Sequence, residues 1–128
     1  MKSITLFRPV GVRDLALLRD SGFRRWPSRL AEQPIFYPET NEAYAAQMAR
    51  DWNTKDDLNG ARGYGVQFRV ASRFLERFEK RVVGGSEHEE YWIPAEDLEA
   101  LNDAIVGTID VIRAFSPDGE CAVDAIPM

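Results

Sequence analysis

Residues 84–98 read GGSEHEEYWIPAEDL and contain a charged turn, a strand and the start of a helix. The segment EEYWIP combines aromatic and β-branched residues, which favour strands, and it ends at Pro94. A proline suits the first turn of a helix because that position needs no backbone N–H donor. Apolar residues then recur at helical spacing, and Gly107 is placed to end the helix: Leu98, Leu101 and Ile105. The pattern predicts a strand at 89–94 and a helix over 94–107.

Towards the N-terminus the sequence alternates between strand and helix patterns. Residues 3–10 have the period of two that is typical of a strand, and residues 11–23 have leucines at helical spacing with Gly22 as a left-handed cap. Residues 40–52 carry the clearest helical pattern, with Thr40 or Asn41 as the N-cap. We expect one apolar stripe of this helix to lie in the core: Ala45, Met48, Ala49 and Trp52.

The remaining segments add short elements. Strands are predicted at 64–70, 81–83 and 108–115, with a short extended piece near Tyr37 and a short helix capped by Ser72. The total is five or six strands and three or four helices, in an irregular order that favours a mixed α+β class. We expect one domain over 1–115, followed by a C-terminal tail over 116–128.

Composition and charge limit the function classes. The chain has 128 residues, 45% of them hydrophobic, and no apolar run approaches the roughly 18 residues of a membrane span. We therefore expect a soluble cytoplasmic protein without a membrane partner. A net charge of −5 makes nucleic acid an unlikely partner. The arginine-rich segment 19–29 could face a small anion, or could be a solvated loop whose arginine stems lie on Trp26.

Few residues are available for catalysis. One histidine, His88, and one cysteine, Cys121, leave only carboxylates to complete a metal site, so we expect no metal. The sequence has no GxSxG nucleophile motif and no GxGxxG or Walker-type phosphate loop. The candidates are Arg8, Tyr37, His88 and Glu90.

The spacing of His88 and Glu90 allows two interpretations. Side chains alternate along a strand, so the two would share a face if the extended conformation begins at His88. They could then perform acid–base chemistry or bind ribose hydroxyls, with Arg8 adding phosphate binding. Alternatively, EHEE is a solvent-facing turn that keeps a sheet edge soluble, Arg8 is exposed or forms an ion pair, and Tyr37 is a core aromatic.

Two resemblances add to this interpretation. The segments LFRPVG, SGFRRWPSRL, QPIFYPETNEAYAAQMARDWN and EHEEYWIPAEDLEALNDAIVG resemble a small bacterial family that carries the label "ADP-ribosylation/crystallin". The order of the elements resembles the ADP-ribosyltransferase fold: an arginine on the first strand, an aromatic FY segment before an alanine-rich helix, and an acidic strand before a helix. That fold implies two short mixed or antiparallel sheets with NAD in the cleft between them.

The second resemblance assigns roles to the candidates. It implies that Arg8 holds NAD, that Tyr37 stacks on nicotinamide, and that Glu90, four residues before Pro94, is the catalytic glutamate. His88 falls where many members of that family have Gln or Glu. The segment YPET stands where such proteins have an STS-like element, which is a departure from the pattern.

Three functions remain open from the sequence. The first is an NAD-dependent ADP-ribosyltransferase or NAD glycohydrolase, which uses a small nucleotide and, as a transferase, a protein target. The second is a non-catalytic binding or regulatory module on the same fold. The third is a small ribonuclease that uses Glu90, His88 and Arg8, which the acidic charge disfavours.

Overall fold

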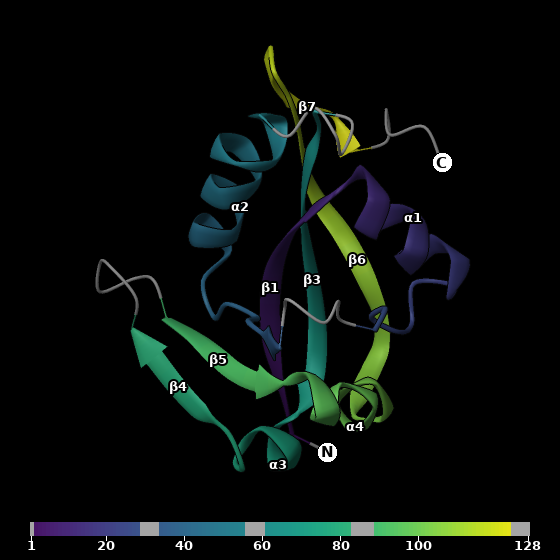
Figure 1. The fold of residues 1–128 in the computed structure, drawn as a ribbon, viewed down its shortest axis with the longest axis vertical. Helices are drawn as coiled ribbons and strands as arrows, with labels where there is room; N and C mark the ends of the chain where they lie inside the picture. The colour runs from purple at the N-terminus through teal and green to yellow at the C-terminus, as the bar shows by residue number, and fades with distance from the viewer. Residues whose placement is uncertain (1, 29–33, 56–60, 83–88, 124–128) are drawn as a thin grey trace.

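The computed structural model describes residues 2–28, 34–55, 61–82 and 89–123. In these residues two antiparallel sheets combine with four α-helices, which confirms the α+β class (Figure 1). The larger sheet has the order β1 (Ser3–Gly11), β3 (Gly63–Ala71), β6 (Ile105–Ser116) and β7 (Gly119–Cys121). The smaller sheet has the order β2 (Ile35–Phe36), β5 (Glu89–Pro94) and β4 (Glu79–Val82).

One hydrophobic core contains residues from both sheets. The strand β3 lies between β1 and β6, and its alternate residues Val66, Phe68 and Val70 are fully buried. Phe36 of β2 and Ile93 of β5 belong to the same cluster. The predicted period of two along β3 therefore places its apolar side chains in this core, and the smaller sheet packs against them.

Two helices begin or end as the sequence predicts. The helix α1 (Val12–Asp20) is followed by Gly22 at φ 73°, and the N–H of Phe23 donates to the carbonyl of Leu18 at 2.8 Å. This is the hydrogen bond of a Schellman cap. The helix α2 (Glu42–Asp51) is capped by Asn41, whose side chain accepts from the N–H of Tyr44 at 3.1 Å.

A glycine allows α2 to lie close to the larger sheet. A Cβ atom on Gly63 would overlap the backbone carbonyl of Ala49 and the side chain of Asn53. The helix consequently packs directly on β1 and β3, and Figure 1 shows it beside these long strands. None of the helices in the described residues is long and apolar enough to cross a membrane.

Three predictions for individual residues are wrong. Trp52 is not in the core, because it follows the last turn of α2 and is 68% exposed. Ser72 does not cap a helix: it lies inside the four-residue helix α3 (Ser72–Leu75), and its hydroxyl donates to the carbonyl of Lys2. Gly107 does not end a helix, since it lies within β6 at φ 82°.

The helix predicted over 94–107 is shorter than expected. A 3-10 turn, η3 (Ala95–Asp97), leads into α4 (Leu98–Asp103), and the chain then enters β6 at Ile105. The β-branched residues Ile105 and Val106 pair with Val70 and Arg69 of β3. A strand partner of the right register therefore outweighs the helical spacing of Ile105. At the other end of β6, part of the predicted tail forms β7 and pairs with it.

Candidate functional site

The segment 38–40 connects the two sheets through its backbone. The N–H of Phe7 donates to the carbonyl of Glu39 at 2.8 Å, and the N–H of Glu39 donates to the carbonyl of Phe7 at 2.7 Å. On the other side, the N–H of Thr40 donates to Glu89 and the N–H of Tyr91 donates to Pro38, both at 2.9 Å. Glu39 is therefore paired with β1 and with β5 at once.

A cleft of about 500 Å³ lies beside this connection. Arg8 from β1, Tyr37 from the segment after β2 and Glu90 from β5 all line it, although these residues are far apart in the sequence. The fourth predicted site residue, His88, lies outside the described residues. The cleft is also lined by apolar and polar residues from α1, α2 and the connecting loops, among them Trp26, Phe36, Glu39 and Tyr44.

Two glutamates face each other across strands at this cleft. Glu39 is directly opposite Glu90 in the antiparallel pairing, and the residues are only 4% and 8% exposed. Like charges in opposite positions of a sheet destabilise it, and buried carboxylates also lose hydration. The pair is therefore costly unless at least one member is protonated.

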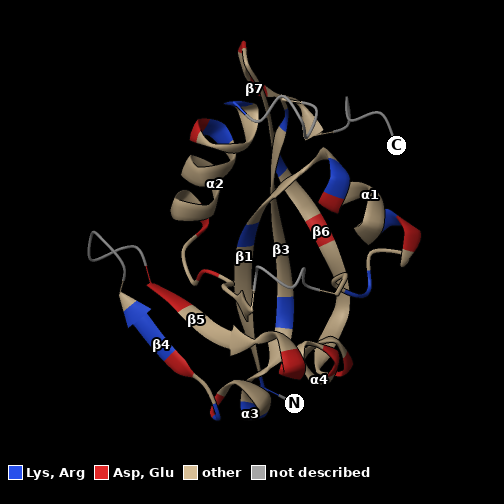
Figure 2. Ribbon diagram, viewed as in Figure 1, with Lys and Arg blue, Asp and Glu red and all other residues tan. Residues whose placement is uncertain are grey.

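The environment separates the two carboxyl groups. Burial raises the pKa of Glu39 to about 8, and the charge of Glu90 raises it too, while Arg8 opposes the change. Burial also raises the pKa of Glu90, but a hydrogen bond from Trp92 and the charge of Arg8 act against it. Figure 2 shows acidic residues on β5 and in the segment before α2, and a basic residue on β1. At neutral pH the proton consequently resides on Glu39.

Aromatic rings surround the guanidinium of Arg8. Its central carbon lies 4.5 Å from the ring centre of Phe36 and 5.5 Å from that of Trp26. The backbone of Trp26 is in turn fixed by the buried side chain of Asn102, which accepts from the backbone N–H of Trp26 at 2.8 Å and donates to its backbone carbonyl at 3.0 Å. The face of an aromatic ring attracts a cation, so Phe36 and Trp26 stabilise the charged guanidinium of Arg8.

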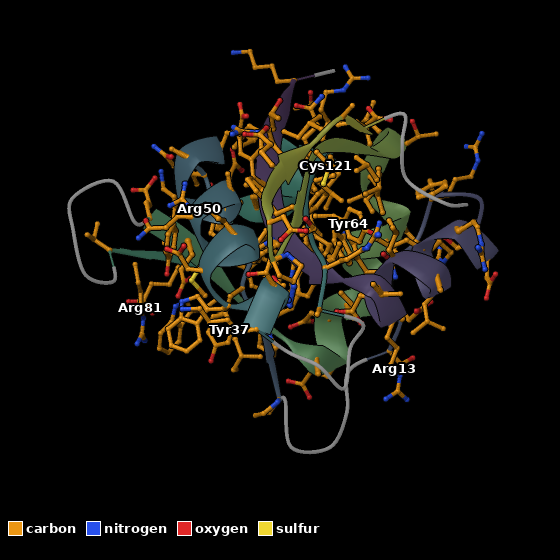
Figure 3. The ribbon with its side chains drawn as sticks, turned by 90° about the horizontal axis from the view of Figure 1, so that it is seen from above. Arg13, Tyr37, Arg50, Tyr64, Arg81 and Cys121 are labelled. Carbon is orange, nitrogen blue, oxygen red and sulfur yellow. The ribbon has the colours of Figure 1, made fainter. Side chains whose placement is uncertain are left out.

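A second aromatic arrangement orients Glu90. The indole N–H of Trp92 donates to Oε1 of Glu90 at 3.1 Å, because alternate residues of β5 share a face. Tyr37 contacts Trp92 edge-on at 5.4 Å between ring centres, and Arg81 of β4 lies 3.8 Å from the centre of the Trp92 ring. Figure 3 shows Tyr37 and Arg81 on the same side of the molecule. Tyr37 thus contacts the residue that holds the Glu90 carboxylate.

The arginine-rich segment contributes to the fold as well as to this region. Arg25 forms ion pairs with Glu99 and Asp103 around α4, at 2.7 and 3.1 Å. Arg25 does not line the cleft, whereas Arg13 of α1 does. Arg25 is therefore paired with α4, and among the described residues the arginines that line the cleft are Arg8 and Arg13.

Sequence reasoning missed several polar residues of the cleft, among them Glu39 and Tyr44. Glu39 occurs in YPET, which stood out only as a departure from a family pattern, and Tyr44 gave no signal beyond an aromatic on a helix. Burial and the neighbouring Glu90 and Glu39 raise the pKa of Tyr44. An acidic residue between a proline and a helix cap is ordinary in sequence, so only the pairing with β5 reveals Glu39.

The chemical capacity of the cleft follows from these groups. It has the carboxyl groups of Glu39, Glu90 and Asp14, the two arginines Arg8 and Arg13, and several aromatic rings, and burial raises the pKa of Glu39 to about 8. Across the described ranges, no group of three or more His, Cys, Asp or Glu side chains is placed to hold a metal ion. Such a set can bind an anion next to an aromatic ring and can stabilise or protonate a reacting centre.

Comparisons of the chain with protein-family models, with curated proteins and with solved structures find no match. The resemblances described from the sequence therefore stay predictions, and the chemistry of the cleft has to be argued from its own residues.

Proposed function

We propose that the cleft binds NAD and that the chain cleaves the nicotinamide–ribose bond, as an ADP-ribosyltransferase or an NAD glycohydrolase. The observation that carries this proposal is the convergence of Arg8, Tyr37 and Glu90 in one cleft. The volume of about 500 Å³ is within the range of small-molecule sites, and the mixture of aromatic and charged residues suits a nucleotide.

Glu90 acts as the catalytic carboxylate in this proposal. When the bond between C1′ and nicotinamide breaks, its electron pair goes to the pyridine nitrogen and positive charge develops on the ribose. A carboxylate held next to that charge stabilises the transition state more strongly than water does. Trp92 and Arg8 both favour the ionised form of Glu90 that this role requires. Water, or an acceptor group of a protein target, then bonds to C1′ and releases a proton.

The other two residues bind the substrate. Arg8 contacts the pyrophosphate through charge-assisted hydrogen bonds, and its position over Phe36 and Trp26 limits the orientations of its guanidinium. Tyr37 stacks on nicotinamide, since its ring is partly exposed in the cleft and is supported by Trp92.

A non-catalytic binding module is the second candidate. It is favoured by the raised pKa of Glu90, because a carboxyl group that is protonated more readily stabilises an oxocarbenium-like centre less well. The same cleft would then bind a nucleotide without cleaving it.

One experiment separates these candidates. Calorimetry measures NAD binding and chromatography measures nicotinamide release, for the wild type, Glu90→Gln and the control Glu89→Gln. Glu89 lies on the same strand but contacts Thr40 and Lys80 instead of lining the cleft. We expect Glu90→Gln to bind NAD within a few-fold of wild type and to release nicotinamide about 100-fold more slowly. The control should match the wild type.

Each other outcome has a definite meaning. Binding without any nicotinamide release by the wild type would favour the non-catalytic module. Absence of NAD binding by the wild type would contradict both candidates. Equal release by Glu90→Gln and wild type would show that Glu90 is not the catalytic carboxylate.

A further inference from the structure

The cleavage of NAD leaves one feature of the cleft without a role. Nicotinamide departs from a positively charged pyridinium, so it takes the bonding electrons and needs no proton. One ionised carboxylate, Glu90, is sufficient for that step. The second carboxyl group, Glu39, is nevertheless held opposite Glu90 at considerable cost.

The position of Glu39 is fixed by its backbone. Its N–H and carbonyl both bond to Phe7, and the residues on either side of it bond to β5. The side chain lines the cleft and is 4% exposed, and within the described parts of the chain its Oε2 has no hydrogen-bond partner. A buried carboxyl oxygen without a partner costs free energy, unless a ligand supplies the missing hydrogen bond.

The charged and titratable groups around Glu39 come from β1, α1, α2, β5 and the segment after β2. Two of them change the pKa of Glu39 directly: the charge of Arg8 lowers it and the charge of Glu90 raises it. Tyr44 of α2 responds to the charges of Glu39 and Glu90. Further groups line the same cleft: Arg13, Asp14 and Tyr37. Among the described residues that line the cleft, Arg8 and Arg13 are the cations, and they stand beside the three carboxyl groups of Glu39, Glu90 and Asp14.

Two carboxyl groups that share a buried site commonly hold one proton between them. Here the protonated member is Glu39, whose pKa is raised to about 8, and the member that receives a hydrogen bond from Trp92 is Glu90. A carboxylic acid beside a carboxylate is the pair that enzymes use to cleave glycosidic bonds whose leaving group requires a proton.

We propose that Glu39 is a second catalytic residue, a proton donor. Besides the nicotinamide–ribose bond of NAD, the cleft then cleaves the bond between the uncharged purine base and the ribose of a purine nucleotide. This inference rests on the proposed use of the cleft for glycosidic cleavage and names a further substrate class for it. Its geometric basis is the placement of Glu39 and Glu90 on opposite positions of paired strands, both at the cleft.

Water is the only co-reactant in this hydrolysis. The bond between C1′ and the purine nitrogen breaks, its electron pair goes to the base, and the proton of Glu39 goes to a ring nitrogen of the base. Glu90 stabilises the positive ribose. Water then bonds to C1′ and gives one proton to the Glu39 carboxylate, which restores the starting state.

The test compares two substrates on the full chain. Adenine release from AMP and nicotinamide release from NAD are measured for the wild type, Glu39→Gln, Glu90→Gln and the control Glu42→Gln, whose side chain lies outside the cleft. We expect Glu39→Gln to lose adenine release by 100-fold or more, and to keep nicotinamide release within about threefold. Retained nicotinamide release also shows that Glu39→Gln is folded. Glu90→Gln should lose both activities, and Glu42→Gln neither.

The pH dependence gives a second readout. Adenine release by the wild type should fall about tenfold per pH unit above a pH of about 8, as Glu39 loses its proton, while nicotinamide release shows no such fall. Equal loss of both activities in Glu39→Gln, or adenine release as fast as wild type, would overturn the role of Glu39. Cleavage of AMP but not NAD would contradict the proposed NAD activity and support this inference. Cleavage of NAD but not AMP would overturn this inference alone, and cleavage of neither would overturn both.

Discussion

Two clusters in this molecule contain the same kinds of side chain, one arginine and two glutamates, yet they differ in burial, in hydrogen bonding and in the direction in which the pKa of a glutamate shifts. In the buried cluster, Arg8 lies near Glu39 and Glu90 at the cleft. In the exposed cluster, Arg113 of β6 donates two hydrogen bonds to Glu120 at 2.7 and 2.8 Å, and a third to Glu42 at 3.3 Å. Both glutamates of the exposed cluster have about half of their side-chain surface in water.

Burial and hydrogen bonds, more than the presence of an arginine, decide whether the pKa of a glutamate is raised or lowered in this fold. The hydrogen bonds from Arg113 lower the pKa of Glu120, so that glutamate stays ionised in the fold. Burial raises the pKa of Glu39 and of Glu90 in spite of their arginine. A fold that needed only a paired charge would use the first arrangement. The second is the kind of perturbed group that occurs at functional sites.

The largest expected effect is a pH dependence of stability that Glu39 causes. Its folded-state pKa of about 8 is above the ordinary 4.5, so the folded state keeps a proton that the unfolded state loses between these values. The free energy of unfolding should therefore fall by about 1.4 kcal/mol per pH unit in this interval. Urea denaturation of wild type and Glu39→Gln from pH 5 to 8 measures it. The variant should become the more stable protein as pH rises, and parallel curves would contradict the raised pKa.

Removal of each arginine sharpens the contrast between the clusters. Arg8→Ala leaves two buried carboxyl groups without their cation and loses its contact with Phe36, so we expect a loss of about 3 kcal/mol at pH 7. Arg113→Ala breaks ion pairs that are exposed to water, so the loss should be at most about 1 kcal/mol. Denaturant midpoints at equal slope measure both. Similar losses in the two variants would show that burial does not distinguish the clusters.

A smaller effect should follow from Trp92→Phe, which keeps an aromatic ring but removes the donor to Glu90. The hydrogen bond lowers the pKa of Glu90, so its loss should raise that pKa further. The stability cost is about 1 kcal/mol. In a pH profile of nicotinamide release, the acidic limb should move to higher pH. A profile identical to that of the wild type would show that the indole does not control the ionisation of Glu90.

The smallest effect is expected for Glu120→Gln. Because the pKa of Glu120 is lowered in the fold, its contribution is present at neutral pH and is lost as pH falls through the folded-state value, the opposite sign to that of Glu39. Solvent and salt screen this exposed charge, so the melting temperatures of variant and wild type should agree within the scatter of replicates in moderate salt. A clear difference in moderate salt would mean that the exposed cluster does more than hold β7 to β6.

Sequence patterns predict most of the fold because its signals are local. The period of two in β3, the Asn41 cap and the glycine after α1 each act within a few residues, and each is confirmed. The errors occur where a distant partner decides. Ile105 has helical spacing but pairs with Val70, and Trp52 has the right interval for the core but follows the end of its helix.

The candidate site was predictable only in part for the same reason. Residue types and strand spacing make Arg8, Tyr37 and Glu90 candidates, and the family resemblance gives them roles that stay predictions; the three residues line one cleft. Glu39 could not be found from local sequence, because its significance comes from pairing with Glu90, about fifty residues further along the chain. No periodicity links two positions so far apart.

The double pairing at residue 39 also has a consequence for evolution. The hydrogen bonds that join β1 to this segment are made by the peptide group of Glu39, which every residue except proline possesses in full. At this position the backbone therefore connects the sheets, and the side chain alone determines the chemistry. A population of such sequences could exchange glutamate for glutamine there and so change the chemistry of the cleft, while the backbone hydrogen bonds between the sheets stay in place.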